Sequence, residues 1–270
     1  MSILPEGLSH RSERFAAWVA TYNYARFREA AQNLELRRNA IAVLAYVRDH
    51  KVIGTQSTGN MPRKHIRAAT ADFITPPVLD QQIGDRIYKL RTEFEVWPLL
   101  FIHGLLEVAE FLVTPNGAQW QITDTGERFL EEEPLFQTLS LFSTWWHRVD
   151  WRFATGHSIE LPRNFPTATS AYLLSQPIGR WFEFETFATT LGQRTGLSRA
   201  LPNPLGGDRQ DVDRGLLLYD VRRMVTDRLI DFGVAEGRYR EEIIGPISSK
   251  RIDAFKLTWL GKALLEGLTL

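Results

Sequence analysis

Two stretches of the chain, "QITDTGERFL" (Gln121–Leu130) and "KLTWLGKALL" (Lys256–Leu265), share one pattern of residue types. Each contains an aliphatic residue, a Thr, two further residues, a Gly, two further residues and an apolar pair. The pattern predicts that a strand ends just before the Thr and that Thr123 or Thr258 caps the helix that follows. We therefore expect the chain to hold two related structural units.

The elements expected around the two stretches follow one order: helix, short strand, helix, helix, hairpin and closing helix. In the first unit they are expected at residues 36–50, 51–55, 62–74, 97–112, 113–122 and 124–133, with a loop at 75–87. In the second they are expected at residues 168–176, 181–184, 185–196, 211–233, 234–258 and 259–268. The second hairpin is expected to pair strands 234–243 and 252–258 around a long turn. Residues 11–34 predict a further helix.

Two turn signals support this order. Asn116-Gly117 is the dipeptide most typical of a tight hairpin turn, which favours a hairpin at 113–122. Gly233 is expected to stop the long helix of the second unit.

This order of elements resembles the winged-helix family, in which a helix-turn-helix core is followed by a β-hairpin wing. The resemblance covers residues 36–133 and 167–270 and implies an α+β chain dominated by helices. Residues 1–35 would form an N-terminal helical segment, and residues 134–166 an aromatic-rich linking helix and loop. Members of the family mostly bind DNA, and others bind only protein.

The segment "VIGTQSTGNMPRKH" (Val52–His65) begins like a nucleotide-binding P-loop, with four residues between Gly54 and Gly59. A P-loop needs Lys and then Ser or Thr directly after the second Gly. Asn60 and Met61 stand there instead, so we expect no nucleotide site. Asn60 is expected to cap the following helix.

The expected nucleic-acid contacts are cations and polar residues on these helices and wings. The helix at 97–112 is apolar on nearly all sides, and its acids Glu107 and Glu110 would repel phosphates, so the first unit is not expected to read bases with it. The contacts that we expect are listed in chain order: Arg63, Lys64, Arg67, Tyr219, Arg222, Arg223, Thr226, Arg238, Arg240, Lys250 and Arg251.

Four of these residues share one helix. Tyr219, Arg222, Arg223 and Thr226 are expected to lie on an exposed flank, opposite an apolar stripe that runs from Leu218 to Leu229.

Composition limits the other options. The chain has 270 residues, a formal net charge of zero and no Cys. Thiolate metal sites and disulfides are thereby excluded, and the scattered His residues predict no metal site. No run of residues has the length of a membrane span or the apolar core of a signal peptide, so a cytoplasmic protein without membrane contact is expected.

The function expected from these observations is DNA binding without catalysis, as a regulator or as a DNA-contacting subunit of a larger complex. The partner would be double-stranded DNA, and no cofactor is expected. The alternative is an adaptor or scaffold subunit whose winged helices bind protein only. Its partner could use aromatic-rich surfaces, for which the segment from Phe136 to Trp151 is a candidate.

Overall fold

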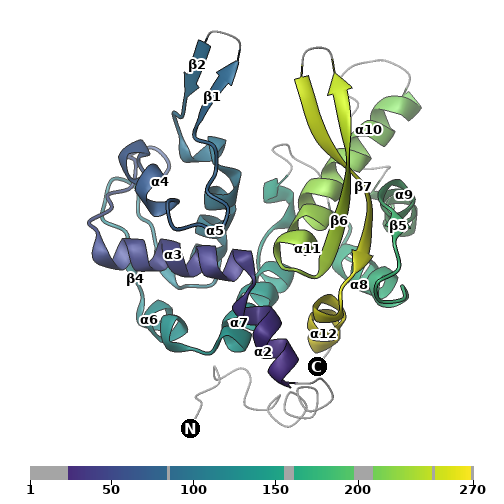
Figure 1. The fold of residues 1–270 in the computed structure, drawn as a ribbon, viewed down its shortest axis with the longest axis horizontal. Helices are drawn as coiled ribbons and strands as arrows, with labels where there is room; N and C mark the ends of the chain where they lie inside the picture. The colour runs from purple at the N-terminus through teal and green to yellow at the C-terminus, as the bar shows by residue number, and fades with distance from the viewer. Residues whose placement is uncertain (1–23, 84–85, 155–160, 198–208, 245–246, 269–270) are drawn as a thin grey trace. The chain divides into compact units, whose positions relative to one another are not determined.

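The computed structural model describes residues 24–83, 86–154, 161–197, 209–244 and 247–268 (Figure 1). The chain is mainly helical, and its described strands form small antiparallel sheets, so the α+β class is confirmed. It divides into two compact units. One is Arg28–Val149, and the other is Asp150–Leu270 together with the described residues up to Phe27. Of the helix expected at 11–34, α2 (Tyr24–Gln32) is described, and residues 11–23 lie outside the described part.

The unit Arg28–Val149 is built around a helix that is buried almost all round. Its elements are α3 (Glu35–Asp49), α4 (Arg63–Ala69), β1 (Asp80–Ile83), β2 (Arg86–Lys89), η2 (Glu93–Glu95), α5 (Trp97–Val108), β3 (Leu112–Val113), β4 (Gln121–Ile122), α6 (Asp124–Glu131) and α7 (Pro134–His147). The buried residues of α5 run from Leu99 to Leu106, with Gly104 half-buried. The apolar face of α3, with Val43, Leu44 and Val47, belongs to the same core. Burial of these side chains is the main stabilising contribution in this unit.

The first expected hairpin is confirmed. Strands β3 and β4 pair antiparallel, with Leu112 opposite Ile122 and Val113 opposite Gln121. The strand expected at 51–55 is reduced to one bridge, between Ile53 and Gln119.

A second hairpin in this unit corrects the loop expected at 75–87. Strands β1 and β2 pair antiparallel, from Asp80 opposite Lys89 to Ile83 opposite Arg86. Figure 1 shows this hairpin extending away from α4 and α5. All four residues of β2 are exposed. A strand without a buried face has no alternation of apolar and polar residues, which is the pattern that predicts strands.

The unit that contains Asp150–Leu270 has longer strands. Its elements are η3 (Trp151–Ala154), α8 (Phe165–Leu174), β5 (Phe182–Glu183), α9 (Phe184–Thr195), α10 (Arg209–Val221), the π-helical segment η5 (Arg222–Thr226), α11 (Asp227–Asp231), β6 (Ala235–Ile244), β7 (Ile247–Leu257) and α12 (Trp259–Gly267). The sheet order is β5-β7-β6, all antiparallel. The long turn expected after residue 243 is wrong, because β7 begins at Ile247 and only residues 245 and 246 separate the strands.

The two Thr-x-x-Gly corners have the same geometry. Thr123 and Thr258 both have φ −83° and ψ 166°, and each caps the following helix as predicted. The Thr123 hydroxyl accepts from the Gly126 N–H at 3.0 Å, and the Thr258 hydroxyl accepts from the Gly261 N–H at 2.8 Å. Each hydroxyl also donates to a carbonyl oxygen at 2.6 Å, that of Glu110 or that of Gly233.

The helix ends that face these corners also match. Glu110 (φ 62°) and Gly233 (φ 64°) both adopt the left-handed conformation that closes a helix. The next N–H reaches back five residues in each case, from Phe111 to the Leu106 oxygen at 3.0 Å and from Val234 to the Leu229 oxygen at 2.8 Å. The role expected for Gly233 as a helix stop is therefore confirmed.

Candidate nucleic-acid interface

The three cations expected on α4 lie together at one surface groove. Arg63, Lys64 and Arg67 line a groove of about 450 Å³ together with Leu90, the residue that follows β2. All three cations are exposed. The described structure therefore brings together, within one unit, the first three residues of the expected interface.

Asp80 at the base of the β1–β2 hairpin joins that hairpin to α4. Its carboxylate accepts from the Leu90 N–H at 3.3 Å and from the Arg67 guanidinium at 2.9 Å. The Leu90 hydrogen bond, and then the Arg67 hydrogen bond, hold the pKa of Asp80 below its ordinary value. Asp80 therefore fixes the hairpin base beside the groove and offsets the charge of Arg67.

The start of α4 differs from the expectation. The N-cap is Pro62, and no side chain caps the helix, so Asn60 is not the capping residue. Pro62 fixes φ near −65°, which suits the first turn of a helix. The cationic side chains of this seven-residue helix are Arg63, Lys64 and Arg67.

The Gly54–Gly59 loop uses three of its N–H groups in backbone hydrogen bonds within the unit. The Gly54 N–H donates to the Ala118 oxygen at 2.9 Å, the Thr55 N–H to the Asn60 oxygen at 2.9 Å, and the Gly59 N–H to the Thr55 oxygen at 3.0 Å. A P-loop needs such N–H groups to point at phosphates. Here they are used inside the protein, which supports the expectation that this loop is not a nucleotide site.

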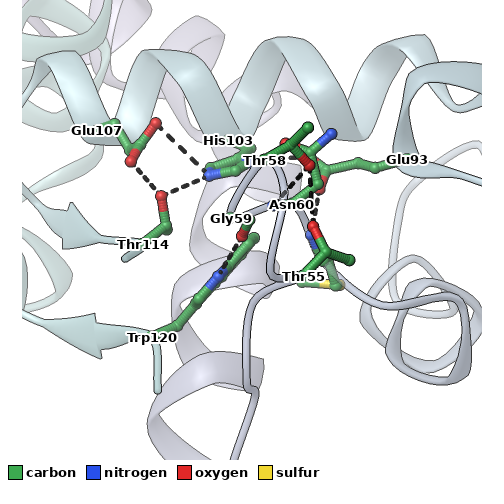
Figure 2. A network of polar contacts seen from close by, with 10 residues as sticks. Thr55, Thr58, Gly59, Asn60, Glu93, His103, Glu107, Thr114 and Trp120 are labelled. Atoms are coloured by element: carbon green, nitrogen blue, oxygen red, sulfur yellow. Dashed lines mark hydrogen bonds and ion pairs between the residues drawn. The ribbon is translucent and has the colours of Figure 1, made fainter. Parts of the chain in front are cut away.

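A buried polar network lies behind this loop (Figure 2). The His103 ring is hydrogen-bonded through both nitrogens, Nδ1 to Glu93 at 2.7 Å and Nε2 to the Thr114 hydroxyl at 2.9 Å. The Thr114 hydroxyl also donates to Glu107. Glu93 is fully buried, and its second oxygen accepts from the Met61 N–H at 2.5 Å. The network therefore connects α5 with the residue just before Pro62.

Trp120 adds a second connection to the same loop. Its ring lies 4.4 Å from the His103 ring, and its Nε1–H donates to the Gly59 oxygen at 2.8 Å (Figure 2). No sequence motif marks Glu93, Thr114 or Trp120. A lone His in the apolar run Leu99–Leu106 was the only available signal, and it does not reveal partners ten or eleven residues away. The network positions the loop that leads into α4.

The flank expected on the long helix of the other unit is only partly present. Thr226 is fully buried, so its assignment to an exposed flank is wrong. Segment η5 is π-helical, and a π-helical turn rotates the side chains relative to the 100° per residue of an α-helix. Arg222 is half-buried and its guanidinium lies 3.4 Å from Asp227, whereas Tyr219 is exposed and Arg223 half-buried.

The four cations expected on the β6–β7 hairpin also differ in their exposure and pairing. Arg238 is paired with Asp253 at 2.7 Å. Arg240 and Lys250 are exposed, and together with Arg238 they line a groove of about 490 Å³ that also contains Trp181 and Tyr239. Arg251 is half-buried and stands opposite Arg240 in the strand register. Two acids, Glu236 and Glu241, line the same groove, so this surface is of mixed charge.

The aromatic-rich segment is largely part of the core. Phe142, Trp145, Trp146 and Trp151 are buried, so these rings do not form the exposed surface that a partner would contact. Larger exposed apolar side chains lie instead around the β1–β2 hairpin: Val78, Ile87, Tyr88 and Phe94. Among the described residues, no group of His, Asp or Glu could hold a metal ion, and no helix has the length and apolarity to cross a membrane.

Comparison with known proteins gives a family match for one part of the chain. The model of the Y4jL N-terminal domain matches residues 32–135, which include α4, the loop before it and the buried network. No curated protein matches this chain.

Two solved structures match, and both are of one enzyme. The restriction endonuclease FokI bound to DNA aligns at 14% identity and a TM-score of 0.37 over 92% of this chain and 46% of that one. A second structure of restriction endonuclease FokI aligns at 16% identity and a TM-score of 0.36 over 87% of this chain and 45% of that one. This chain thus spans less than half the length of either. The expectation of a protein without catalysis is corrected, because both neighbours are enzymes. At these TM-scores the likeness carries no argument about any residue of the site.

Proposed function

We propose that this protein binds double-stranded DNA through two winged-helix units, and that the α4 groove of the unit Arg28–Val149 contacts the phosphate backbone. The observation that carries the proposal is the convergence of Arg63, Lys64 and Arg67 on one exposed groove. Clustered, exposed cations are the surface that phosphate binding requires, and an overall neutral chain can supply them locally.

The charges of the groove favour contact with phosphate over the alternative, in which α4 only presents a charged face to solvent. Asp80 offsets Arg67, but Arg63 and Lys64 form no ion pair or hydrogen bond with any described side chain. Lys89 and Arg91, the exposed sequence neighbours of Leu90, do not line the groove. The two positive charges of Arg63 and Lys64 thus remain available at one surface, and charge-assisted hydrogen bonds to phosphate are among the stronger polar contacts.

The winged-helix interpretation is supported by the matching corners. Thr123 and Thr258 share dihedral angles, hydrogen-bond partners and the left-handed residue that ends the preceding helix. In each unit a hairpin leads into the corner, and a single strand segment pairs beside it, Ile53 with Gln119 and Phe182 with Phe255. In this proposal β3–β4 and β6–β7 are the two wings, and Arg240 and Lys250 add contacts from the second.

The test is equilibrium binding of a fluorescent DNA duplex to the full chain and to the variant Arg63→Ala/Lys64→Ala. The matched control is Arg38→Ala/Lys51→Ala, which removes one Arg and one Lys that are exposed in the same unit but do not line the groove. We expect the groove variant to bind at least about tenfold more weakly and the control to bind like wild type. Equal binding by all three proteins would contradict the assignment of the groove.

A second candidate function is an adaptor that binds protein only. The observation that favours it is the exposure of Val78, Ile87 and Phe94, which are large apolar side chains in one unit. On this alternative, wild type would show no affinity for duplex DNA even at low salt, and the groove variant would behave in the same way.

A further inference from the structure

The unit Arg28–Val149 lacks the reading helix that its fold would otherwise provide. In a helix-turn-helix the second helix lies in the major groove. Here that helix is α5, and its buried residues Leu99 to Leu106 belong to the core of the unit. Its exposed residues are only Pro98 and Glu107, and a carboxylate is repelled by phosphates. If the α4 groove holds the phosphate backbone of DNA, any contact with the bases has to come from an element other than α5.

The β1–β2 hairpin occupies the place of the turn between α4 and α5. A helix-turn-helix connects its two helices by a few residues, whereas here residues 70–96 separate α4 from α5 and include the whole hairpin. Its base is held beside the α4 groove, because Asp80 bonds both the Arg67 guanidinium and the Leu90 N–H. The hairpin therefore begins at the surface assigned to phosphates and extends away from it (Figure 1).

The exposed side chains of β2 suit a nucleic-acid groove. Successive residues of a strand point to opposite faces, so Arg86 and Tyr88 lie on one face and Ile87 and Lys89 on the other. Ile87 is 64% exposed and Tyr88 49% exposed, and neither face of β2 is buried. Each face thus combines one cation with one large apolar or aromatic side chain. Cations contact phosphates and base acceptors, and apolar groups contact the thymine methyl group.

The dimensions of the hairpin agree with this role. The major groove of B-DNA is about 12 Å wide and admits a two-stranded β-ribbon. Four residues of strand span about 13 Å, and β1 and β2 each have four residues. An isolated two-stranded ribbon is only marginally stable in water, so a partner that covers Ile87 and Tyr88 would also stabilise it.

We propose that the β1–β2 hairpin enters the major groove of duplex DNA while the α4 groove holds the adjacent backbone. This inference rests on the proposed function of the α4 groove and adds the element that reads the groove. The juxtaposition that carries it is an exposed strand, β2, with cationic and apolar side chains, in a hairpin that Asp80 fixes beside a cluster of cations, next to a helix that is buried.

The test compares two duplexes of one sequence, one unmodified and one in which every cytosine is glucosylated 5-hydroxymethylcytosine. The sugars fill the major groove and leave the phosphate charges unchanged. We expect wild type to bind the glucosylated duplex at least about tenfold more weakly. The variant Ile87→Ser/Tyr88→Ser should bind the unmodified duplex more weakly than wild type and should lose the discrimination. Ile178→Ser, which changes an exposed apolar residue that lies in neither hairpin and lines neither groove, is the matched control and should behave like wild type.

The outcomes separate this inference from the proposed function. Wild type could bind both duplexes equally while Arg63→Ala/Lys64→Ala binds both more weakly. That result would support the role of the α4 groove and overturn the role of the hairpin. If the hairpin variant binds and discriminates like wild type, the inference is overturned. If wild type binds neither duplex, both proposals fail. Thermal unfolding of each variant checks that the exposed substitutions leave the fold intact.

Discussion

The two Thr-x-x-Gly corners are alike, but the hairpins that lead into them differ greatly in length. The corner at Thr123 follows strands of two residues, and the corner at Thr258 follows strands of ten and eleven. Each corner is set by short-range sterics, because a Cβ on Gly126 would lie 2.2 Å from the Phe111 oxygen and one on Gly261 would lie 2.0 Å from the Val234 oxygen. The hairpins extend beyond these contacts and are free to vary.

The difference extends to the rest of each unit. The unit with the short β3–β4 hairpin contains the additional hairpin β1–β2 and the buried network around His103. The unit with the long β6–β7 hairpin has a third strand, β5, beside it. The Thr-x-x-Gly corner is thus common to both units, whereas the hairpins distinguish one unit from the other.

The largest effect is expected from the network that sets the first unit apart. The change His103→Leu would leave the buried Glu93 carboxylate without its ring partner. Removing one member of a buried, hydrogen-bonded pair destabilises by about 3–5 kcal/mol. Urea denaturation should report this loss, and hydrogen exchange should place it in α5 and in the loop before α4. His50→Leu changes an exposed His in the same unit and should lower the free energy of unfolding far less. A small effect at His103 would show that the network does not hold this unit together.

Substitution of the corner glycines tests whether the two corners are equivalent. Gly126→Ala and Gly261→Ala each place a methyl group against a backbone oxygen that cannot move away easily. We expect each to destabilise its unit by about 2–3 kcal/mol in urea denaturation. Gly215→Ala, where the added methyl group meets nothing within 4 Å, should be neutral or slightly stabilising. A loss of unfolding free energy at only one corner would show that the two corners are not equivalent.

The capping threonines Thr123 and Thr258 are expected to contribute equally to the stability of the two corners, with a smaller effect than the glycines. Thr123→Val and Thr258→Val keep the shape of the side chain but remove the hydroxyl that accepts from Gly126 or Gly261. Each change should cost about 1–2 kcal/mol of unfolding free energy, the usual value of a helix N-cap. Thr→Ser at either position keeps the hydroxyl and should cost less. Unequal losses of unfolding free energy at the two positions would mean that the two caps differ in strength although their dihedral angles match.

The smallest effect concerns the β1–β2 hairpin, which has no counterpart in the other unit. Because the pKa of folded Asp80 is lowered, its stabilising contribution is present above the ordinary pKa of 3.8 and is lost as the pH falls through the folded value. Hydrogen exchange should show the Leu90 N–H protected at neutral pH and less protected in acid, after correction for intrinsic exchange. Asp80→Asn should remove that pH dependence, and Asp72→Asn should leave it. A pH dependence that persists in Asp80→Asn would rule out this anchor.

Local patterns in the sequence predicted the corners well. They did not predict features that depend on residues far apart in the sequence. The caps at Thr123 and Thr258 and the helix stop at Gly233 follow from a few neighbouring residues. The hairpin β1–β2 was missed because neither face of β2 is buried, so no alternation of apolar and polar residues marks that strand.

The site was predictable in part for the same reason. Arg63, Lys64 and Arg67 share one short helix, so their convergence could be inferred from spacing alone. Thr226 was misplaced because one π-helical turn shifts the helix phase, and sequence spacing does not reveal such a turn. The Glu93 carboxylate reaches Met61 over a separation of 32 residues, which only the tertiary structure shows.

The salt dependence of duplex DNA binding tests the central claim most directly. Binding through phosphates releases counterions, so the logarithm of the binding constant falls linearly with the logarithm of the salt concentration. We predict a steep slope for wild type between about 50 and 200 mM salt. For Arg63→Ala/Lys64→Ala we predict a slope smaller in magnitude by about two, or one for each contact removed. Arg38→Ala/Lys51→Ala should keep the wild-type slope. Equal slopes for wild type and the groove variant, or no binding by wild type at low salt, would contradict the account.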